Sequence, residues 1–366
     1  MTVEDIALQM TPGIGVKGAV HLLECFGTAE RIFAATEDEL IGQAELRPEP
    51  ARQILRRAGF AAAEKEIKHC RKHDIKAIAS TDPDYPALLR EIPDYPHVIY
   101  VKGDPQALAA RSLTVVGTRD MTSYGLNMCN KLVCRLAERV PHLTIVSGLA
   151  FGIDIAAHRA ALVSGIPTVS VLPCALPGIV PAQHTAVARD MLDHGGALLT
   201  ELHSQTRQNG TAYLARNRII AALGAGCVIV ESPDGGGSLI TARFADEYDR
   251  TVMAVPGRAT DRSSSGTNHL IRNRKAQLVL SAEDIIVEMG WDLETEPAIL
   301  RVTPEPQALT REETSLLECF RTSDPLSVDT LRELSGLDPG GLAALLLGLE
   351  LAGAVRQLPG NRYMKL

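Results

Sequence analysis

Hydrophobic residues recur at two different spacings along the chain, and the change of spacing divides it into regions. Up to about residue 74 they follow helical spacing, as in Val16–Phe26 and in the long amphipathic segment 52–74. From Ile75 onward, short continuous apolar runs alternate with helical segments. Beyond residue 308, three helical segments precede two short β runs. The pattern therefore predicts a helical region, a larger α/β region and a small third region.

The first region, residues 1–74, is predicted to contain short helices around a glycine-rich turn. Gly13 to Gly18 spells G-x-G-x-x-G, the dinucleotide-binding fingerprint, but that motif must follow a strand and here it follows a helix. We interpret it as the turn of a helix-hairpin-helix in a SAM-like helical module. Its glycines allow a sharp turn and can present amide groups to a phosphate. DNA contact and a purely structural role are both compatible with this turn.

Residues 75–289 carry the strand and helix alternation. Continuous apolar strands such as 143–146 and 227–230 are typical of parallel strands that are buried on both faces. We expect an α/β fold with an extended Rossmann-like, doubly wound and mainly parallel sheet. Ligands of such sheets bind at the carboxyl ends of the strands, so candidate chemistry is expected there.

The last two segments differ from the α/β region in charge and composition. Residues 290–308 are rich in proline and acidic residues and predict a linker. Residues 309–366 combine three helical segments, the first opening with a capping box at Thr310, with a hairpin signal at 359–361, which predicts a winged helix. Its third helix, 340–352, has no Lys or Arg, and residues 305–366 hold nine acidic and six basic residues. Because a recognition helix needs cations to approach a duplex, we expect this domain to serve protein contacts or structure.

Composition narrows the class of protein. The chain has 366 residues, of which 45% are hydrophobic and 22% charged, with a formal net charge of −7. Its most apolar stretch, 342–355, is interrupted by glycines and a glutamate and is shorter than the ~20 residues of a membrane-spanning helix. Seven cysteines without a C-x-x-C pair, and an acidic N-terminus, predict a cytoplasmic protein with reduced thiols. His69 and His73 have cations around them, so no metal site is expected.

Three strand ends run into glycines, hydroxyl side chains and the start of a helix. Glycines allow close approach of the backbone, and a helix N-terminus favours an anion. Since the carboxyl ends of parallel strands meet at one edge of a sheet, we expect a row of phosphate-binding loops there. The candidate residues are Gly117, Thr118 and Arg119 in the first loop, Ser147 and Gly148 in the second, and Gly237, Ser238 and Thr241 in the third. No P-loop motif occurs, so ATP hydrolysis is not indicated.

A cationic cluster lies at the start of the predicted helix 214–223. Arg216 and Arg218 flank Asn217 where the helix dipole disfavours cations, which is unfavourable unless an anion binds there. The planar fork of arginine suits phosphate oxygens. Tyr213 either stacks on a base, an interaction worth ~1–3 kcal/mol, or packs in the core. Residues 200–280 hold ten basic and seven acidic residues, which makes this segment locally positive.

Two groups of residues allow an enzymatic interpretation. Ser147, Asp154 and His158 suggest a hydrolase, but Ser147 is not in a G-x-S-x-G elbow, and Asp154 and His158 are one helical turn apart and can simply pair. The alternative function is a nucleotide-processing enzyme that hydrolyses an N-glycosidic bond. The loop 234–238 is loosely similar to the phosphate loop of such enzymes, and Glu231 and Asp234 are the candidate carboxylates beside it.

In their order along the chain, these motifs resemble the DNA-processing protein DprA (Smf) family. The matching segments are 82–89, 116–119, 146–154 with Ala157 and His158, 216–220, 237–242, 254–257 and 266–271, which together span about residues 75–285. The resemblance implies a non-enzymatic, cofactor-free protein that binds single-stranded DNA without sequence preference and protects it. It also implies loading of RecA recombinase in natural transformation and homologous recombination, and a homodimer formed through the Rossmann-like domain.

The resemblance also assigns residues. Arg119 matches the arginine of the phosphate loop, and 216–218 match the Arg-Asn-Arg motif. Tyr213-Leu214 stands where the family typically has Phe-Pro, which keeps the aromatic residue for stacking. Residues 208–210 lack the basic residue that is frequent in the family, and we expect one phosphate contact to be weaker as a result. The loop before Ser238 reads Asp-Gly-Gly-Gly where the family usually has Ser-Gly.

Overall fold

The computed structural model describes residues 1–109, 111–206, 210, 212–291, 311–320, 326–351, 354–358 and 362–365. It consists of two compact units, Met1–Asp292 and Leu293–Leu366. The first unit contains the helical module and the α/β region, and the second contains the small C-terminal region.

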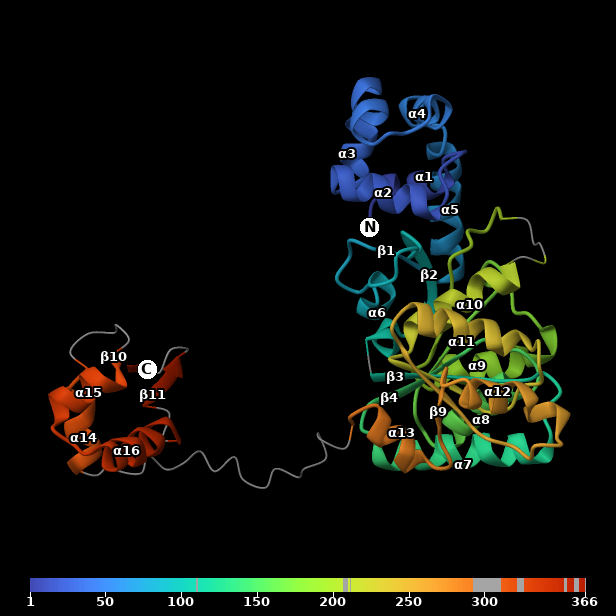
Figure 1. Ribbon diagram of the computed structural model, residues 1–366. Coiled ribbons are helices and arrows are strands. Elements are labelled where there is room, and N and C mark those ends of the chain that lie inside the picture. Colours follow the sequence, from blue (N-terminus) through green and yellow to red (C-terminus); the bar gives the residue numbers. More distant parts are fainter. Residues whose placement is uncertain are drawn as a thin grey trace. The chain divides into compact units, whose positions relative to one another are not determined.

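A nine-stranded sheet forms the centre of the first unit (Figure 1). The strand order is β1-β2-β6-β5-β4-β3-β7-β8-β9. All neighbours from β6 to β9 are parallel, whereas β1 and β2 add an antiparallel edge. This confirms the mainly parallel Rossmann-like sheet. The strands are β1 Lys76–Ala79, β2 Val98–Gly103, β3 Arg111–Val116, β4 Leu143–Ser147, β5 Thr168–Val171, β6 Ala197–Thr200, β7 Gly226–Ile229, β8 Thr251–Ala254 and β9 Gln277–Leu278.

Helices cover both faces of the sheet, because successive residues of the central strands point to opposite sides. Ile145 packs on one face with α7, α8 and α13, and Val146 packs on the other with α6, α10 and α11. Figure 1 shows α7 and α13 on the side of the sheet opposite α10 and α11. The helices are α6 Ala87–Arg90, α7 Ser123–Arg139, α8 Ile153–Val163, α9 Thr185–Asp193, α10 Ala212–Leu223, α11 Gly237–Glu247, α12 Ser265–Arg272 and α13 Ala282–Glu288.

The helical module differs from its prediction in one element. The helices are α1 Val3–Met10, α2 Val16–Phe26, α3 Ala29–Ala34, α4 Pro48–Leu55 and α5 Phe60–His73. The single helix expected over 52–74 was therefore wrong, since α4 ends and α5 begins within it. The helix is interrupted at Arg57, which has φ +53°, and α5 then begins after Gly59. A Cβ on Gly59 would lie 2.1 Å from the Ala7 carbonyl oxygen of α1, so glycine permits the close approach of the two helices. Gly13, with φ +85°, forms the sharp turn between α1 and α2.

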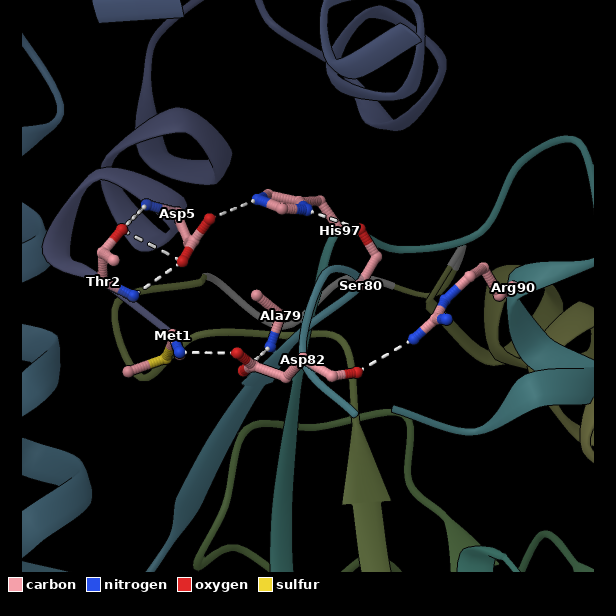
Figure 2. A network of polar contacts seen from close by, with 8 residues as sticks. All are labelled: Met1, Thr2, Asp5, Ala79, Ser80, Asp82, Arg90 and His97. Carbon is pink, nitrogen blue, oxygen red and sulfur yellow. Dashed lines mark hydrogen bonds and ion pairs between the residues drawn. The ribbon is translucent and has the colours of Figure 1, made fainter. Parts of the chain in front are cut away.

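A buried polar chain joins this module to the sheet (Figure 2). Asp5 of α1 accepts a hydrogen bond from His97 Nε2 at 3.0 Å, and His97 Nδ1 lies 2.9 Å from Ser80 Oγ. Burial by itself would raise the pKa of Asp5, but hydrogen bonds from His97 and the Thr2 backbone hold that pKa below its usual value. A second link runs from the Tyr100 hydroxyl to Gln9 Oε1 at 2.8 Å and from Gln9 Nε2 to the Glu201 carbonyl at 2.8 Å. Polar as well as apolar contacts therefore hold the module against the sheet.

The substitution Tyr100→Phe is expected to lower the free energy of unfolding by about 1 kcal/mol, because it removes one donor and leaves the Gln9 acceptor without it. Urea denaturation measures the change. Tyr213→Phe is the matched control, since within the described part of the chain the Tyr213 hydroxyl makes no hydrogen bond. Equal stability of Tyr100→Phe and wild type would show that the link from Tyr100 to Gln9 contributes nothing to docking.

The second unit is a small winged helix, as the sequence predicts. Its hydrophobic core includes Leu316, Phe320, Leu331, Leu346 and Leu349. The elements are α14 Arg311–Glu318, β10 Leu326–Ser327, α15 Val328–Ser335, α16 Pro339–Leu351, β11 Val355–Leu358 and β12 Arg362–Lys365, with the antiparallel order β10-β12-β11. The expected cap at Thr310, the hairpin signal 359–361 and most of the linker, 292–308, lie outside the described residues.

The α/β region extends slightly further along the chain than the sequence predicts. Trp291, expected in the linker, is buried against the core of the first unit, so the α/β region continues to that residue.

Among the helices described, none combines the length and the apolar character needed to cross a membrane.

Candidate functional site

A cavity of about 410 Å³, here called the central cavity, lies at the carboxyl ends of β3 and β7. β3 lies between β4 and β7, and the chain reverses its direction across the sheet at this point. Such switch points are the usual ligand crevices of doubly wound sheets. Nine of the twelve predicted residues line the cavity: Gly117, Thr118, Arg119, Tyr213, Arg216, Asn217, Gly237, Ser238 and Thr241.

The loop after β3 is held in place by Glu231, which lies two residues beyond the end of β7. The Thr118 amide donates to the Glu231 carbonyl at 2.6 Å. The buried Glu231 carboxylate accepts hydrogen bonds from the Thr122 amide and hydroxyl, each at 2.8 Å. A Cβ on Gly117 would lie 2.5 Å from Ile153, so glycine is required for this packing. The loop is therefore a pre-formed wall of the cavity.

The loop before α11 presents backbone amides to the cavity. Gly236, Gly237 and Ser238 line it where α11 begins. The Gly236 amide donates to the Pro233 carbonyl at 3.1 Å, whereas Gly237 and Ser238 are in the first turn of the helix, whose amides have no partner within the helix. The Ser238 hydroxyl is buried and donates to Ser232 Oγ at 2.8 Å, so it stabilises the loop. Gly237 has open space where a Cβ would lie. This end of the cavity favours an anion.

Arg119 is the exposed cation of the site. Its guanidinium carbon lies 5.8 Å from the centre of the Tyr213 ring, in a cation–π contact. Within the described residues Arg119 has no carboxylate partner. Tyr213 remains 38% exposed, so of the two alternatives for this residue the structure excludes packing in the core and leaves its ring accessible for stacking. Arg119 and Tyr213 together offer a free cation and an aromatic ring at one edge of the cavity.

Arg216 reaches the cavity wall but is committed to the fold. It is 6% exposed, and its Nη1 donates to the carbonyls of Gly148 at 2.6 Å and Val171 at 2.8 Å. Burial lowers the pKa of the guanidinium, although the carboxylate of Asp154 acts in the opposite direction. A Cβ on Gly148 would lie 2.0 Å from Arg216 Nη1, so the absence of a side chain at Gly148 makes room for this arginine. Arg216 therefore ties α10 to the ends of β4 and β5.

Arg218 and Ser147 do not line the central cavity. Arg218 is 7% exposed and forms ion pairs with Glu201 and, at 3.7 Å, with Asp94. Ser147 is fully buried and its hydroxyl donates to the Val115 carbonyl at 2.7 Å. The helix dipole predicts an anion near the arginines of α10. In the structure the anions near these arginines are carboxylates of the protein itself, namely those of Asp94, Glu201 and Asp154.

The groups that suggested hydrolysis have other partners. His158 is buried and bonded through Nδ1 to Thr168 Oγ1 at 2.7 Å, and so does not pair with Ser147. Both oxygens of Glu231 are occupied by Thr122, and exposed Asp234 pairs with His269 Nδ1 at 2.7 Å. Among the described residues, no three His, Cys, Asp or Glu side chains are grouped to hold a metal ion. The two hydrolase interpretations gain no support from this geometry.

The site residues predicted from the sequence leave out two residues that shape the site. Thr122 is the N-cap of α7, and its hydroxyl donates to the Glu231 carboxylate. The sequence feature that indicates this cap is a threonine at the start of a predicted helix, three residues before Gly125. Phe151, in the loop after β4, is 45% exposed and lines a second hollow next to the central cavity. A half-exposed phenylalanine has no signal in the sequence, because local pattern does not reveal exposure.

Comparison with known proteins agrees with this architecture. The family described as DNA recombination-mediator protein A matches residues 76–290, and the DprA winged helix domain matches residues 301–361. Protein Smf of Escherichia coli (strain K12) is 36% identical over 288 residues, which are 77% of this chain and 75% of that protein. DNA processing protein DprA of Bacillus subtilis (strain 168) is 36% identical over 220 residues, or 60% of this chain and 73% of that protein.

Two solved structures are similar to this chain. DNA processing protein A from Streptococcus pneumoniae has a TM-score of 0.67 and 30% sequence identity, with 79% of this chain and 98% of that chain covered. DNA processing protein A from Helicobacter pylori, described for its single-stranded DNA binding mode, has a TM-score of 0.53 and 27% identity, with 60% of this chain and 96% of that chain covered.

Proposed function

The chain belongs to the DprA/Smf family of DNA recombination mediators, and we propose that it binds single-stranded DNA in the central cavity without regard to base sequence. The observation that carries the proposal is the exposed Arg119 beside Tyr213, in the same cavity as the amides at the start of α11. A cation with free amides suits a phosphate, and an aromatic ring suits a base of any identity. The Helicobacter pylori relative, described for single-stranded DNA binding, supports this choice of ligand.

The proposed contacts follow the geometry of the cavity. Arg119 and the amides of the loop before α11 bind phosphates, and Tyr213 stacks on a base. Arg216, Ser147, Gly148 and Arg218 support the walls from behind. The proposed lining of the DNA site is Gly117, Thr118, Arg119, Tyr213, Asn217, Gly237, Ser238 and Thr241.

The wider role proposed rests on family membership. The bound strand is protected and handed to RecA recombinase in natural transformation and homologous recombination. The protein acts in the cytoplasm as a homodimer formed through its Rossmann-like domain and catalyses no reaction. The acidic winged helix serves protein contacts instead of duplex binding, since α16 carries no Lys or Arg.

The substitution Arg119→Ala is expected to weaken binding of a labelled oligo-dT strand by about 10- to 100-fold, because a charge-assisted hydrogen bond to phosphate contributes roughly 1.5–3 kcal/mol. The slope of log affinity against log salt should become shallower by about 0.7, because the variant neutralises one phosphate fewer than wild type. Fluorescence anisotropy at several salt concentrations measures both quantities.

Arg243→Ala is the matched control for Arg119→Ala. Arg243 is an exposed arginine of α11 that pairs with Glu247 along the helix and does not line the cavity. Its substitution should leave oligo-dT affinity within about twofold of wild type. Unchanged binding by Arg119→Ala would move the DNA site away from the central cavity, and no binding by wild type would refute the proposed function.

A further inference from the structure

Three exposed lysines form a stripe along α5, the helix that leads from the helical module to β1 (Figure 1). They are Lys65, Lys68 and Lys72, here called the α5 lysine stripe. Their spacing of three and four residues places the Cβ atoms of neighbouring lysines about 5–6 Å apart. The stripe lies on the side of the helix opposite the buried Ala63 and Cys70, so all three ammonium groups extend from one face toward solvent.

The positive charge of the stripe is not balanced within the fold. Among the described residues, no carboxylate forms an ion pair with any of the three lysines. Of the two acidic residues of α5, Glu66 is buried, and Glu64 is exposed. The helix dipole stabilises cations only in the last turn, so it accounts for Lys72 but not for Lys65 or Lys68. Like charges at this spacing repel each other, and an anion bound along the stripe would relieve that repulsion.

Hydrogen bonds hold α5 against the same edge of the sheet as the central cavity. His69 Nε2 lies 2.9 Å from the Leu176 carbonyl oxygen, in the loop that follows β5. The Glu66 carboxylate accepts a hydrogen bond from the Ser204 amide at 2.9 Å, beyond the end of β6. Because β3, β4, β5 and β6 are successive parallel neighbours, β5 and β6 end at the same edge as β3, where the central cavity lies.

The loop after β5 connects α5 with the free cation of the proposed DNA site. Its Leu176 carbonyl contacts His69 of α5. At its two ends, Pro173 and Pro181 line the second hollow, which shares Arg119 with the central cavity. The loop between these two prolines carries no charged side chain. A polyanion that passes from Arg119 over this loop therefore meets no carboxylate of the loop before it reaches α5.

We propose that the α5 lysine stripe is a second phosphate-binding surface for the same single strand, which extends the DNA site beyond the central cavity. The inference rests on the proposed single-stranded DNA function and lengthens the contact with the strand. The lysine ammonium is a compact point charge, so the stripe binds phosphates and reads no bases. None of the exposed residues of α5 is aromatic, so the bases that cross the stripe do not stack on it.

The test compares the triple variant Lys65→Gln/Lys68→Gln/Lys72→Gln with wild type on a short and a long oligo-dT strand. Lengths of about 6 and about 24 nucleotides lie on either side of about 16, the upper size of a single-strand site on one domain. The variant should bind the short strand as wild type does. It should bind the long strand about 10- to 100-fold more weakly at about 0.1 M salt, because three phosphates are no longer neutralised. For the long strand, the slope of log affinity against log salt should become shallower by about 2.

The matched control is Lys131→Gln/Arg135→Gln/Arg139→Gln, which removes the same number of positive charges from exposed positions of α7. Two of these cations, Arg135 and Arg139, already pair with Glu283. The control should therefore bind both strands as wild type does. Thermal unfolding checks that each variant is folded.

Three outcomes would overturn the inference while the proposed function stands. One is wild-type affinity of the α5 triple variant for the long strand, under conditions in which Arg119→Ala weakens binding of both strands. Another is an equal loss on the short and the long strand, which would show that the stripe acts through the fold or the net charge. A third is weaker binding of a duplex with unchanged binding of the long single strand, which would make the stripe a duplex site. Absence of oligo-dT binding by wild type would instead refute the proposed function itself.

Discussion

Replacing Arg216 by alanine is expected to destabilise the protein by about 3–5 kcal/mol, the cost of removing one partner from a buried charge pair. The substitution leaves the carbonyls of Gly148 and Val171 without their donor. It also leaves Asp154, buried beneath the cavity, without the cation that opposes the effect of burial on its pKa. Chemical denaturation of the whole chain measures the loss, with Arg119→Ala as the exposed control, expected to change stability by less than about 0.5 kcal/mol.

Asp154→Asn provides a second check on the role of Arg216. If the cost of Arg216→Ala comes partly from an unpaired carboxylate, the double variant should lose less than the sum of the single variants. The outcome that would contradict this account is a stable Arg216→Ala protein that has lost DNA binding. Arg216 would then be a phosphate ligand, as the sequence pattern had suggested, and not a support of the wall.

The protein should also lose stability as the pH falls through the range in which histidine normally titrates. His158 is fully buried, and burial lowers its pKa to about 3, with further contributions from His184 and Arg216. The Thr168 hydroxyl donates to the Ile145 carbonyl, so its oxygen accepts from His158 Nδ1. Among the described residues, His158 Nε2 has no hydrogen-bond partner. The imidazole is therefore neutral in the fold.

The direction of the effect follows from proton binding. Below pH ~6.5 the unfolded chain takes up a proton on His158, whereas the folded chain does so only near pH 3. Stability contributed by His158 is therefore present above pH ~6.5 and falls by about 1.4 kcal/mol per pH unit below it, or about 2 kcal/mol by pH 5. Urea denaturation at pH 7 and pH 5 measures this loss.

His158→Gln separates the effect of His158 from that of the carboxylates. The neutral amide cannot take up the proton, so its loss of stability between pH 7 and pH 5 should be smaller than that of wild type by about 2 kcal/mol. Parallel pH profiles of the two proteins would show that His158 is not the group responsible.

Local patterns predicted the parts of this protein that depend on short stretches of chain. Continuous apolar strands indicated a sheet that is buried on both faces, and Ile145 and Val146 pack on opposite sides of it. Glycines after β3 and before α11 indicated loops that approach other atoms closely, as Gly117 does. Periodicity and the conformational freedom of glycine are properties of a few neighbouring residues, so they are readable without a structure.

Tertiary structure decided which charged groups are free and which are paired. Arg119, Arg216 and Arg218 look alike in the sequence, but Arg119 is exposed beside Tyr213, whereas Arg218 is held by Asp94 and Glu201. The close approach of Gly59 to Ala7 and the contact of the Phe151 ring with His184 depended in the same way on residues that are distant in the sequence. The sequence by itself determined the α/β sheet and the edge of it that carries the candidate site. The fold alone decided which arginine is available to a phosphate, because the free energy of a charge depends on its burial and on partners far along the chain.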